Sequence, residues 1–319
     1  MVDTICIKIK AEDYSKDNWE HLIDLTSKKS TQDENGRLSY MGWYKNFRTI
    51  INADEVILQG SLTKFAVGDN LRTADREQLE QAVRDLSRAT NMDLFQGVVC
   101  RLDLAANLLM KHPTKVYSQF LLDIPLFNRI QVLDGVSFRN TQREVAFYDK
   151  IMEMKNDSYA VVEEELSSKN ILRLEYRFKN KSAVSRMMKL KNPTVKQVLE
   201  NYNNLVITWV DIYKKIYKKK DILQFPNGVF SKTRLLRDYL MVKGIESEGG
   251  TEAILDMINL SKTMGHLNQY PNVTTNLKKS IRDLMDKPLP VLRHSRLIEE
   301  LGKKVGIVGY HALDRESVI

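Results

Sequence analysis

Apolar and polar residues follow a two-residue period in several segments of the first half of the chain, and this period is typical of β-strands. Alternating or short apolar runs predict strands over residues 2–10, 55–60, 97–107, 132–138 and 145–148. The third of these runs is interrupted by charged residues in its middle. The first half of the chain is therefore expected to form a sheet.

The clearest alternation lies in residues 171–178, where charged and apolar side chains take turns. Such a strand has one charged face and one apolar face, so the charged face either meets solvent or lines a charged site. The apolar face is expected to lie in the core. Three charged residues alternate there with four apolar ones: Arg173, Glu175 and Arg177 with Leu172, Leu174, Tyr176 and Phe178.

Helical spacing dominates the rest of the chain. Leucine and valine residues at helical spacing predict a helix over residues 73–91, and the polar stretch 28–37 predicts a loop. After residue 180 the pattern predicts a long helix from residue 193 to about residue 220. Four shorter helices are expected between residues 231 and 303. This change of character predicts two domains, residues 1–182 and 183–319.

The charge of the chain is distributed unevenly. The 319 residues carry a net charge of +8, with residues 1–180 at −2 and residues 181–319 at +10. A basic second half indicates a surface for a polyanion, although a lysine-rich solvated face is an alternative. Only two cysteines are present and no apolar run reaches 18 residues. We therefore expect reduced thiols, no membrane association and a cytoplasmic location.

Several common chemistries lack their motifs in this sequence. There is no CxxC pair, no HExxH and no GxxxxGK[ST] phosphate loop. The five histidines are never two, three or four residues apart, which disfavours a zinc site built from one segment. A nucleotide cofactor is not expected.

Acidic residues on strands and one tyrosine are the remaining candidates. Asp103 and Glu175 are each flanked by apolar residues and by arginine, and such carboxylates on neighbouring strands suit Mg²⁺ or Mn²⁺. Arginine–carboxylate bridges on an exposed sheet are the alternative interpretation. Tyr148 and Lys150 would share a face if their segment is a strand.

Four segments together resemble the replication initiators of filamentous phages and the related II/X family of phage and plasmid replication proteins. In chain order they are VILQGSLTKFAVGDN at 56–70, Arg101-Leu102-Asp103, REVAFYDKIMEM at 143–154 and ILRLEYRFKNKS at 171–182. The resemblance covers about residues 1–185. It implies an α+β fold like that of HUH endonucleases: an antiparallel sheet with helices on one face, here followed by a basic helical domain.

The resemblance also implies an activity, rolling-circle initiation by a site-specific endonuclease and strand transferase. Such an enzyme nicks single-stranded origin DNA through a tyrosine that becomes linked to the 5′ phosphate. On the matched motif the nucleophile is Tyr148, and Lys150 lowers its pKa or steadies the phosphate. A divalent metal, Mg²⁺ or Mn²⁺, would be held by carboxylates because no His-hydrophobic-His strand is present. The implied ligands are Asp103 and Glu175, with Gln59, Glu55 or Glu153 as the third.

The partners follow from this activity. Origin DNA, single-stranded at the nick, is expected to bind, and a helicase and a polymerase of the bacterial host or of the element are expected to act with the protein. Two alternatives stay open, a relaxase-like mobilisation protein and a non-catalytic protein that binds origin or operator DNA. A nuclease that uses water with Asp103 and Glu175 is a third. The expected DNA-binding residues are Lys64, Arg101, Arg139, Arg173, Arg177, Lys218 and Lys219.

Overall fold

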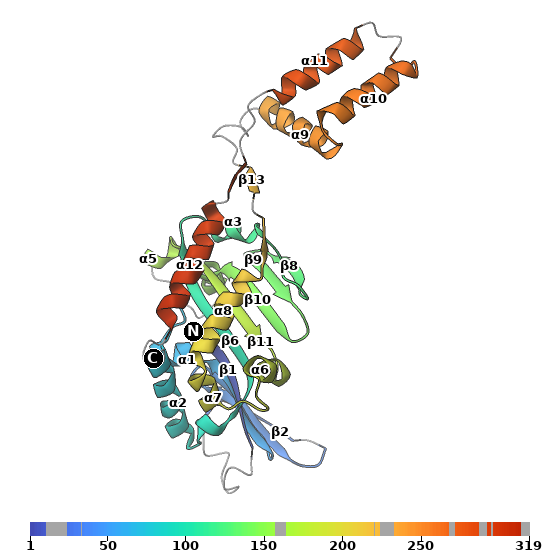
Figure 1. Cartoon of the computed structure of the whole chain (residues 1–319). Coiled ribbons are helices and arrows are strands. Elements are labelled where there is room, and N and C mark those ends of the chain that lie inside the picture. The colour runs from blue at the N-terminus through green and yellow to red at the C-terminus, as the bar shows by residue number, and fades with distance from the viewer. Residues whose placement is uncertain are drawn as a thin grey trace. The chain divides into compact units, whose positions relative to one another are not determined.

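A computed structural model describes residues 1–10, 24–32, 34–156, 164–219, 221–223, 233–267, 272–286, 292–294 and 296–313 (Figure 1). Its strands are β1 Val2–Lys10, β2 Thr26–Gln32, β3 Leu38–Tyr44, β4 Phe47–Ile51, β5 Glu55–Ser61, β6 Val98–Met110, β7 Leu121–Asp123, β8 Asn128–Val132, β9 Gly135–Arg139, β10 Arg143–Asp149, β11 Asn170–Phe178, β12 Tyr217–Lys218, β13 Asp221–Leu223 and β14 Leu292–His294. Its α-helices are α1 Leu62–Val67, α2 Arg76–Thr90, α3 Thr114–Ser118, α4 Lys150–Asn156, α5 Glu164–Ser167, α6 Lys181–Met188, α7 Val195–Glu200, α8 Tyr202–Lys214, α9 Thr233–Ser247, α10 Thr251–Thr263, α11 Val273–Met285 and α12 Arg296–Ala312.

Ten strands form one sheet in the order β2-β3-β4-β5-β1-β6-β11-β10-β9-β8. Every neighbouring pair in it is antiparallel. The centre of the sheet is β6, a strand of 13 residues that pairs with β1 along its first half and with β11 along its second. The predicted α+β fold with an antiparallel sheet is confirmed.

Helices cover the apolar face of this sheet (Figure 1). Helix α2 starts with a capping box between Asp75 and Gln78, and Leu79, Val83 and Leu86 on one side of it are fully buried. Helix α8 buries Trp209, whose indole N–H donates to the backbone oxygen of Leu174 on β11 at 3.1 Å. The sheet and these helices therefore share one core.

The compact units of the chain do not coincide with the predicted division at residue 182. One unit comprises Met1–Lys219 with Arg296–Ile319, and the other comprises Lys220–Ser295. Helices α6, α7 and α8 belong to the sheet because their apolar side chains enter its core. Helix α12 returns to the same unit and contacts α8 and β6. In the second unit, α9, α10 and α11 enclose a small core around Val242, Ile245 and Leu284.

Two predicted elements are wrong in detail. Residues 28–32 form part of β2 instead of a loop, since an exposed edge strand can be polar throughout and thereby avoids pairing with other chains. The single helix expected from residue 193 to 220 is two helices. Helix α7 ends at Glu200 and is capped by Asn201, whose side-chain amide donates to the oxygen of Gln197 at 2.9 Å. Helix α8 ends at Lys214.

Among the described helices, none combines the length and the hydrophobicity that crossing a bilayer requires.

Candidate active site

The face of the sheet opposite the covering helices carries a group of charged side chains at its centre. On β11, Arg173, Glu175 and Arg177 point to this face, as the alternation predicts. The register then brings in the neighbouring strands. Arg177 lies opposite Asp103 on β6, and Arg173 lies opposite Tyr148 on β10. Three predicted site residues, Tyr148, Asp103 and Glu175, are thus brought together.

Tyr148 and Glu175 are joined directly. The hydroxyl of Tyr148 donates to Oε2 of Glu175 at 2.8 Å. Burial and then the negative charge of Glu175 raise the pKa of Tyr148 above its usual range. The phenol therefore keeps its proton at neutral pH and acts as a hydrogen-bond donor.

Two arginines hold Glu175 as a carboxylate. Arg177 donates through Nη2 to its Oε2 at 2.9 Å, and Nε of Arg173 lies 3.8 Å from the same oxygen. Burial by itself would raise the pKa of Glu175, but the hydrogen bond and charge of Arg177 and the charge of Arg173 outweigh it and lower this pKa to about 2. Glu175 is consequently ionised and available as an acceptor.

Asp103 is fully buried beside this pair and is bonded by Arg101. Nε of Arg101 lies 3.1 and 3.2 Å from its two oxygens, and Nη2 lies 2.7 Å from Oδ2. Burial, followed by repulsion from Glu175, raises the pKa of Asp103 to about 7 against the opposing effect of Arg101. As the pH falls, Asp103 takes up a proton before Glu175 does, because the hydrogen bond and charge of Arg177 and the charge of Arg173 stabilise Glu175 as a carboxylate.

Asp103→Asn should therefore change how stability depends on pH. The folded protein holds the Asp103 proton up to about pH 7, whereas an unfolded aspartate releases it at about pH 4. Between these values the native state binds more protons, so the free energy of unfolding falls as pH rises. The asparagine variant is expected to show a flatter profile in urea unfolding across this window. Equal slopes in both proteins would contradict the raised pKa.

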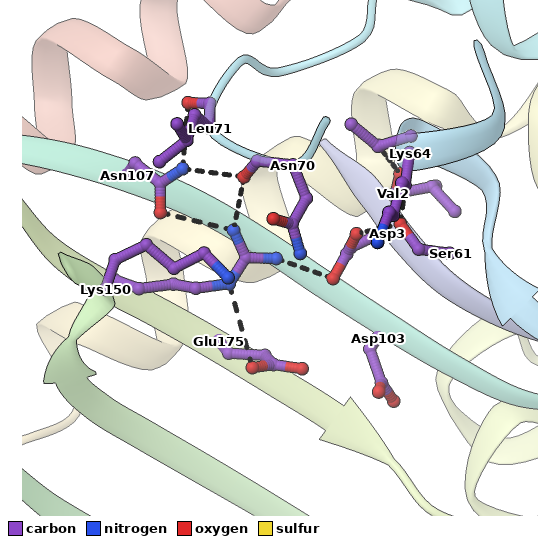
Figure 2. Close-up of polar contacts among 12 residues, drawn as sticks. Val2, Asp3, Ser61, Lys64, Asn70, Leu71, Asp103, Asn107, Lys150 and Glu175 are labelled. Atoms are coloured by element: carbon purple, nitrogen blue, oxygen red, sulfur yellow. Dashed lines mark hydrogen bonds and ion pairs between the residues drawn. The ribbon is translucent and has the colours of Figure 1, made fainter. Parts of the chain in front are cut away.

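Arg173 has more hydrogen-bond and ion-pair partners than the other cations of the site, and Figure 2 labels four of these partners, Asp3, Asn70, Asn107 and Glu175. Its Nη2 donates to Oδ2 of Asp3 at 2.5 Å, and its Nη1 donates to the oxygens of Asn70 and Asn107 at 3.0 and 3.2 Å. Asp3 accepts a second hydrogen bond from Ser61 Oγ at 2.6 Å. Arg173 thereby links the carboxylates of Asp3 and Glu175.

Sequence reasoning missed Asp3. It precedes the alternating part of its strand, which begins only at Ile5, so periodicity did not assign it to either face. The signal was a carboxylate at the start of an otherwise apolar and buried strand, since buried acids are normally paired with a cation.

The structure places Lys150 differently from the expectation. Lys150 is the first residue of α4, so it does not share a strand face with Tyr148. Its side chain is almost completely buried, and Nζ lies 2.5 Å from Oε2 of Glu153. The strand ends at Asp149, whose carboxylate accepts from the amide of Met152 in the first turn of α4 and so favours the start of a helix.

Gln59 does not lie with the other expected metal ligands. It is an exposed residue of β5 that faces Cys6 on β1, two strands away from β6. The other two candidates for a third ligand are paired elsewhere, Glu55 with Lys8 at 2.5 Å and Glu153 with Lys150. In the described ranges, no three His, Cys, Asp or Glu residues are grouped closely enough to hold a metal ion. Asp103 and Glu175 are the pair that the fold brings together.

The expected DNA-binding residues fall into separate places. Arg101, Arg173 and Arg177 belong to the charged centre described above. Near it, Arg139 donates through Nε to Glu144 at 2.8 Å. Three lysines lie elsewhere: Lys64 is exposed on α1, Lys218 lies on β12, and Lys219 follows it. Nζ of Lys218 donates to the oxygens of Tyr213 and Ile216 at 2.7 and 2.9 Å.

Gly135 fixes the spacing of the strand that carries Tyr148. It lies opposite Tyr148, and a Cβ on it would come within 1.8 Å of the backbone oxygen of Phe147. Gly135→Ala should force β9 away from β10 and cost about 1–3 kcal/mol in the free energy of unfolding. Gly306→Ala is the matched control, because its new methyl would meet nothing within 4 Å. Urea unfolding that shows the same small change in both would contradict this packing.

Comparison with known families decides what kind of protein carries this site. The family model Phage_CRI, which describes the N-terminal region of a phage replication-associated protein, matches residues 1–201, well over half of the chain. The chain belongs to the Phage_CRI family. The resemblance to filamentous-phage replication initiators is therefore confirmed, and with it a role in phage DNA replication, in which DNA is the partner. No curated protein matches the chain.

The Phage_CRI match covers most of the first compact unit but ends before its helices α8 and α12. It passes residue 182 and takes in α6 and α7, which pack on the sheet. All the residues of the charged centre lie inside the matched region.

Proposed function

We propose that this member of the Phage_CRI family starts rolling-circle replication by nicking and rejoining single-stranded origin DNA through Tyr148. The observation that carries the proposal is the hydrogen bond from the Tyr148 hydroxyl to Glu175 at 2.8 Å, amid three arginines on the charged face. A tyrosine hydroxyl oriented by a carboxylate suits attack on a phosphodiester. Tyr148 keeps part of its surface exposed, which leaves this side chain partly accessible to DNA.

The proposed step is a transesterification. The Tyr148 oxygen forms a bond to the phosphorus, and the bond from phosphorus to the 3′ oxygen of the preceding nucleotide breaks. That oxygen leaves with the bonding electron pair and takes up a proton from solvent to become the 3′ hydroxyl. The phenolic proton leaves along the existing hydrogen bond to Glu175. Because Glu175 is a weak base with a pKa of about 2, this transfer becomes favourable only as the new bond to phosphorus forms. The reverse reaction rejoins the strand without an external energy source.

The arginines supply positive charge where the phosphate gains negative charge. Arg177 lies against Glu175 and is only partly buried, so its guanidinium can face both the carboxylate and a bound phosphate. Arg101 is partly exposed in the same way. Arg173 is buried and holds Asp3 and Glu175 in position. The role proposed for Lys150 is electrostatic support of the phosphate, although its ion pair with Glu153 offsets part of its charge.

A divalent metal also belongs to the proposal. Asp103 and Glu175 fit Mg²⁺ or Mn²⁺ because such ions commonly use one or two carboxylates, with water and substrate phosphate completing the shell. A bound ion would polarise a non-bridging phosphate oxygen and neutralise charge there. In the structure, Arg101 and Arg177 form ion pairs with these two carboxylates. For an ion to bind there, both guanidinium groups would have to turn partly toward the phosphate.

Other partners complete the proposed reaction. The freed 3′ hydroxyl is a primer, so a host or phage polymerase would extend it and a helicase would unwind the duplex ahead. These events would take place in the cytoplasm of a bacterial host. A relaxase-like mobilisation protein would use the same chemistry on a transfer site instead of an origin.

The test uses the full chain with single-stranded oligonucleotides that cover the origin of its phage, in the presence of Mg²⁺ or Mn²⁺. Mass spectrometry of proteolysed reactions should show a nucleotide-bearing peptide that contains Tyr148. Cleavage without an adduct would instead indicate a hydrolytic nuclease. Binding with neither product would indicate a non-catalytic origin or operator protein.

A further inference from the structure

A row of side chains crosses five strands of the sheet and leads away from the candidate active site. Directly opposed residues of antiparallel strands point to the same face, so a series of opposed pairs traces a continuous line over the sheet. With strands about 4.8 Å apart, the line from β3 to β6 is roughly 19 Å long. Its members in order are Trp43, Arg48, Gln59, Cys6 and Arg101.

This row joins the charged centre at one end and an aromatic side chain at the other. Arg101 bonds to Asp103, so the row lies on the same face as Tyr148 and Glu175. At the far end, Trp43 leaves 47% of its surface exposed. Trp43 therefore offers an accessible aromatic ring at this end of the row.

An open pocket of about 560 Å³ lies at the Trp43 end. Within it, the Nζ of Lys45 lies over the ring of Phe65, 4.7 Å from its centre. Lys64 provides a second cation. Among the described residues that line the pocket there are two lysines and no carboxylate. The volume is within the usual range for small-ligand sites, and the charge favours an anion. The lining residues are Trp43, Lys45, Asn46, Ser61, Lys64, Phe65 and Gly68.

Side-chain contacts connect this pocket to the candidate nucleophile. Ser61 lines the pocket and donates to Asp3 (Figure 2). Asp3 accepts from Arg173 through its other oxygen. Arg173 in turn lies against Glu175, the acceptor for Tyr148. The backbone amide of Lys64 also donates to Ser61 Oγ at 3.0 Å. The pocket and the charged centre are therefore linked by a chain of largely buried side-chain contacts.

We propose that this pocket binds one nucleotide of the single-stranded DNA that flanks the scissile phosphate. The base would stack on Trp43, and Lys45 and Lys64 would contact the adjoining phosphates. An aromatic ring beside lysines is the combination that binds single strands, because every base has a stacking face and every link has a negative charge. The identity of the ligand rests on the proposed function; the existence of the pocket does not.

The Ser61–Asp3–Arg173 contacts give the pocket a second effect. Ser61 and Asp3 are positioning residues, because they connect the pocket to Arg173 beside Glu175. A nucleotide held in the pocket would therefore have a fixed position relative to Glu175. This places the strand across β5 and β1 between the pocket and Tyr148.

The test measures binding separately from nicking. Fluorescence anisotropy with a labelled origin oligonucleotide and a chelator reports affinity while divalent ions are withheld. Trp43→Ala is expected to weaken binding about 5- to 100-fold, in line with the loss of one base–aromatic stack. Trp43→Phe should retain most of the affinity, and Lys45→Ala should weaken binding less at high salt than at low salt. Tyr310→Ala is the matched control, a similarly exposed aromatic residue on α12, and should bind as the wild type does.

The possible results separate the two proposals. Unchanged affinity in Trp43→Ala overturns the nucleotide pocket, whether or not a Tyr148 adduct forms in the wild type. Weakened affinity in Trp43→Ala with no adduct in the wild type supports the pocket and overturns the nicking reaction. Equal losses in Trp43→Ala and Tyr310→Ala would show a non-specific effect and would also overturn the pocket. Photocrosslinking of 5-iodouridine, scanned along the oligonucleotide, should label the Trp43 peptide only within a few nucleotides of the nick.

Discussion

Replacing Tyr148 with phenylalanine is expected to abolish the covalent protein–DNA adduct and to lower strand cleavage by on the order of 10³-fold or more. The ring and its packing are kept, and the loss is confined to the oxygen that donates to Glu175 at 2.8 Å. Because that oxygen is the proposed nucleophile, no other group can form the same phosphotyrosine link. Denaturing gels with labelled oligonucleotides measure both products.

Tyr176→Phe is the matched control for this experiment. Tyr176 lies one residue from Glu175 but on the opposite, buried face of β11, where its hydroxyl accepts from Arg143 at 3.3 Å. Its loss should leave adduct formation within a few fold of the wild type. Continued cleavage in Tyr148→Phe would show that water, not tyrosine, attacks the phosphate. An adduct that persists in Tyr148→Phe would place the nucleophile on another residue.

The second large effect concerns stability. Arg173→Ala is expected to lower the free energy of unfolding by about 3–5 kcal/mol, because it leaves the carboxylates of Asp3 and Glu175 buried with fewer partners. Most of this loss of stability comes from the buried negative charges of Asp3 and Glu175, which no longer face a positive charge from Arg173, and less of it comes from lost packing. Urea unfolding followed by circular dichroism measures it, with the slope of the transition as a check on two-state behaviour.

Two further variants identify the cause. Adding Asp3→Asn to Arg173→Ala removes one uncompensated charge and should restore part of the lost stability. Arg84→Ala breaks an exposed ion pair with Glu80 on α2 and should cost at most about 1 kcal/mol. A loss below about 1 kcal/mol in Arg173→Ala would mean that solvent reaches the pair and screens it.

Periodicity predicted the part of the site that lies on strands. The alternation in residues 171–178 placed Arg173, Glu175 and Arg177 on one face, and the register of the sheet agrees. It could not predict that Arg173 and Glu175 are almost completely buried, because burial depends on residues from β1, β10 and the loop before α2.

The errors have physical causes of the same kind. Lys150 was expected beside Tyr148, but the strand ends between them and helix α4 begins. Gln59 was expected near Asp103, but β1 lies between their strands. The predicted division at residue 182 followed a change from strand to helix pattern, while the compact unit follows the core, which extends to α8 and α12.

The sequence by itself determined the α+β class, most strands, the carboxylates and tyrosine of the candidate site, and the family. The class, the strands, these residues and the family can all be predicted from periodicity and motifs within short segments of one sequence. The tertiary structure alone decided which charges are paired, where Asp3 acts, and how Trp43 and Ser61 connect to Tyr148. Those depend on strand order and register, which bring residues more than 100 positions apart into contact. No local pattern specifies such pairings, because their free energy comes from contacts that exist only once the sheet has formed.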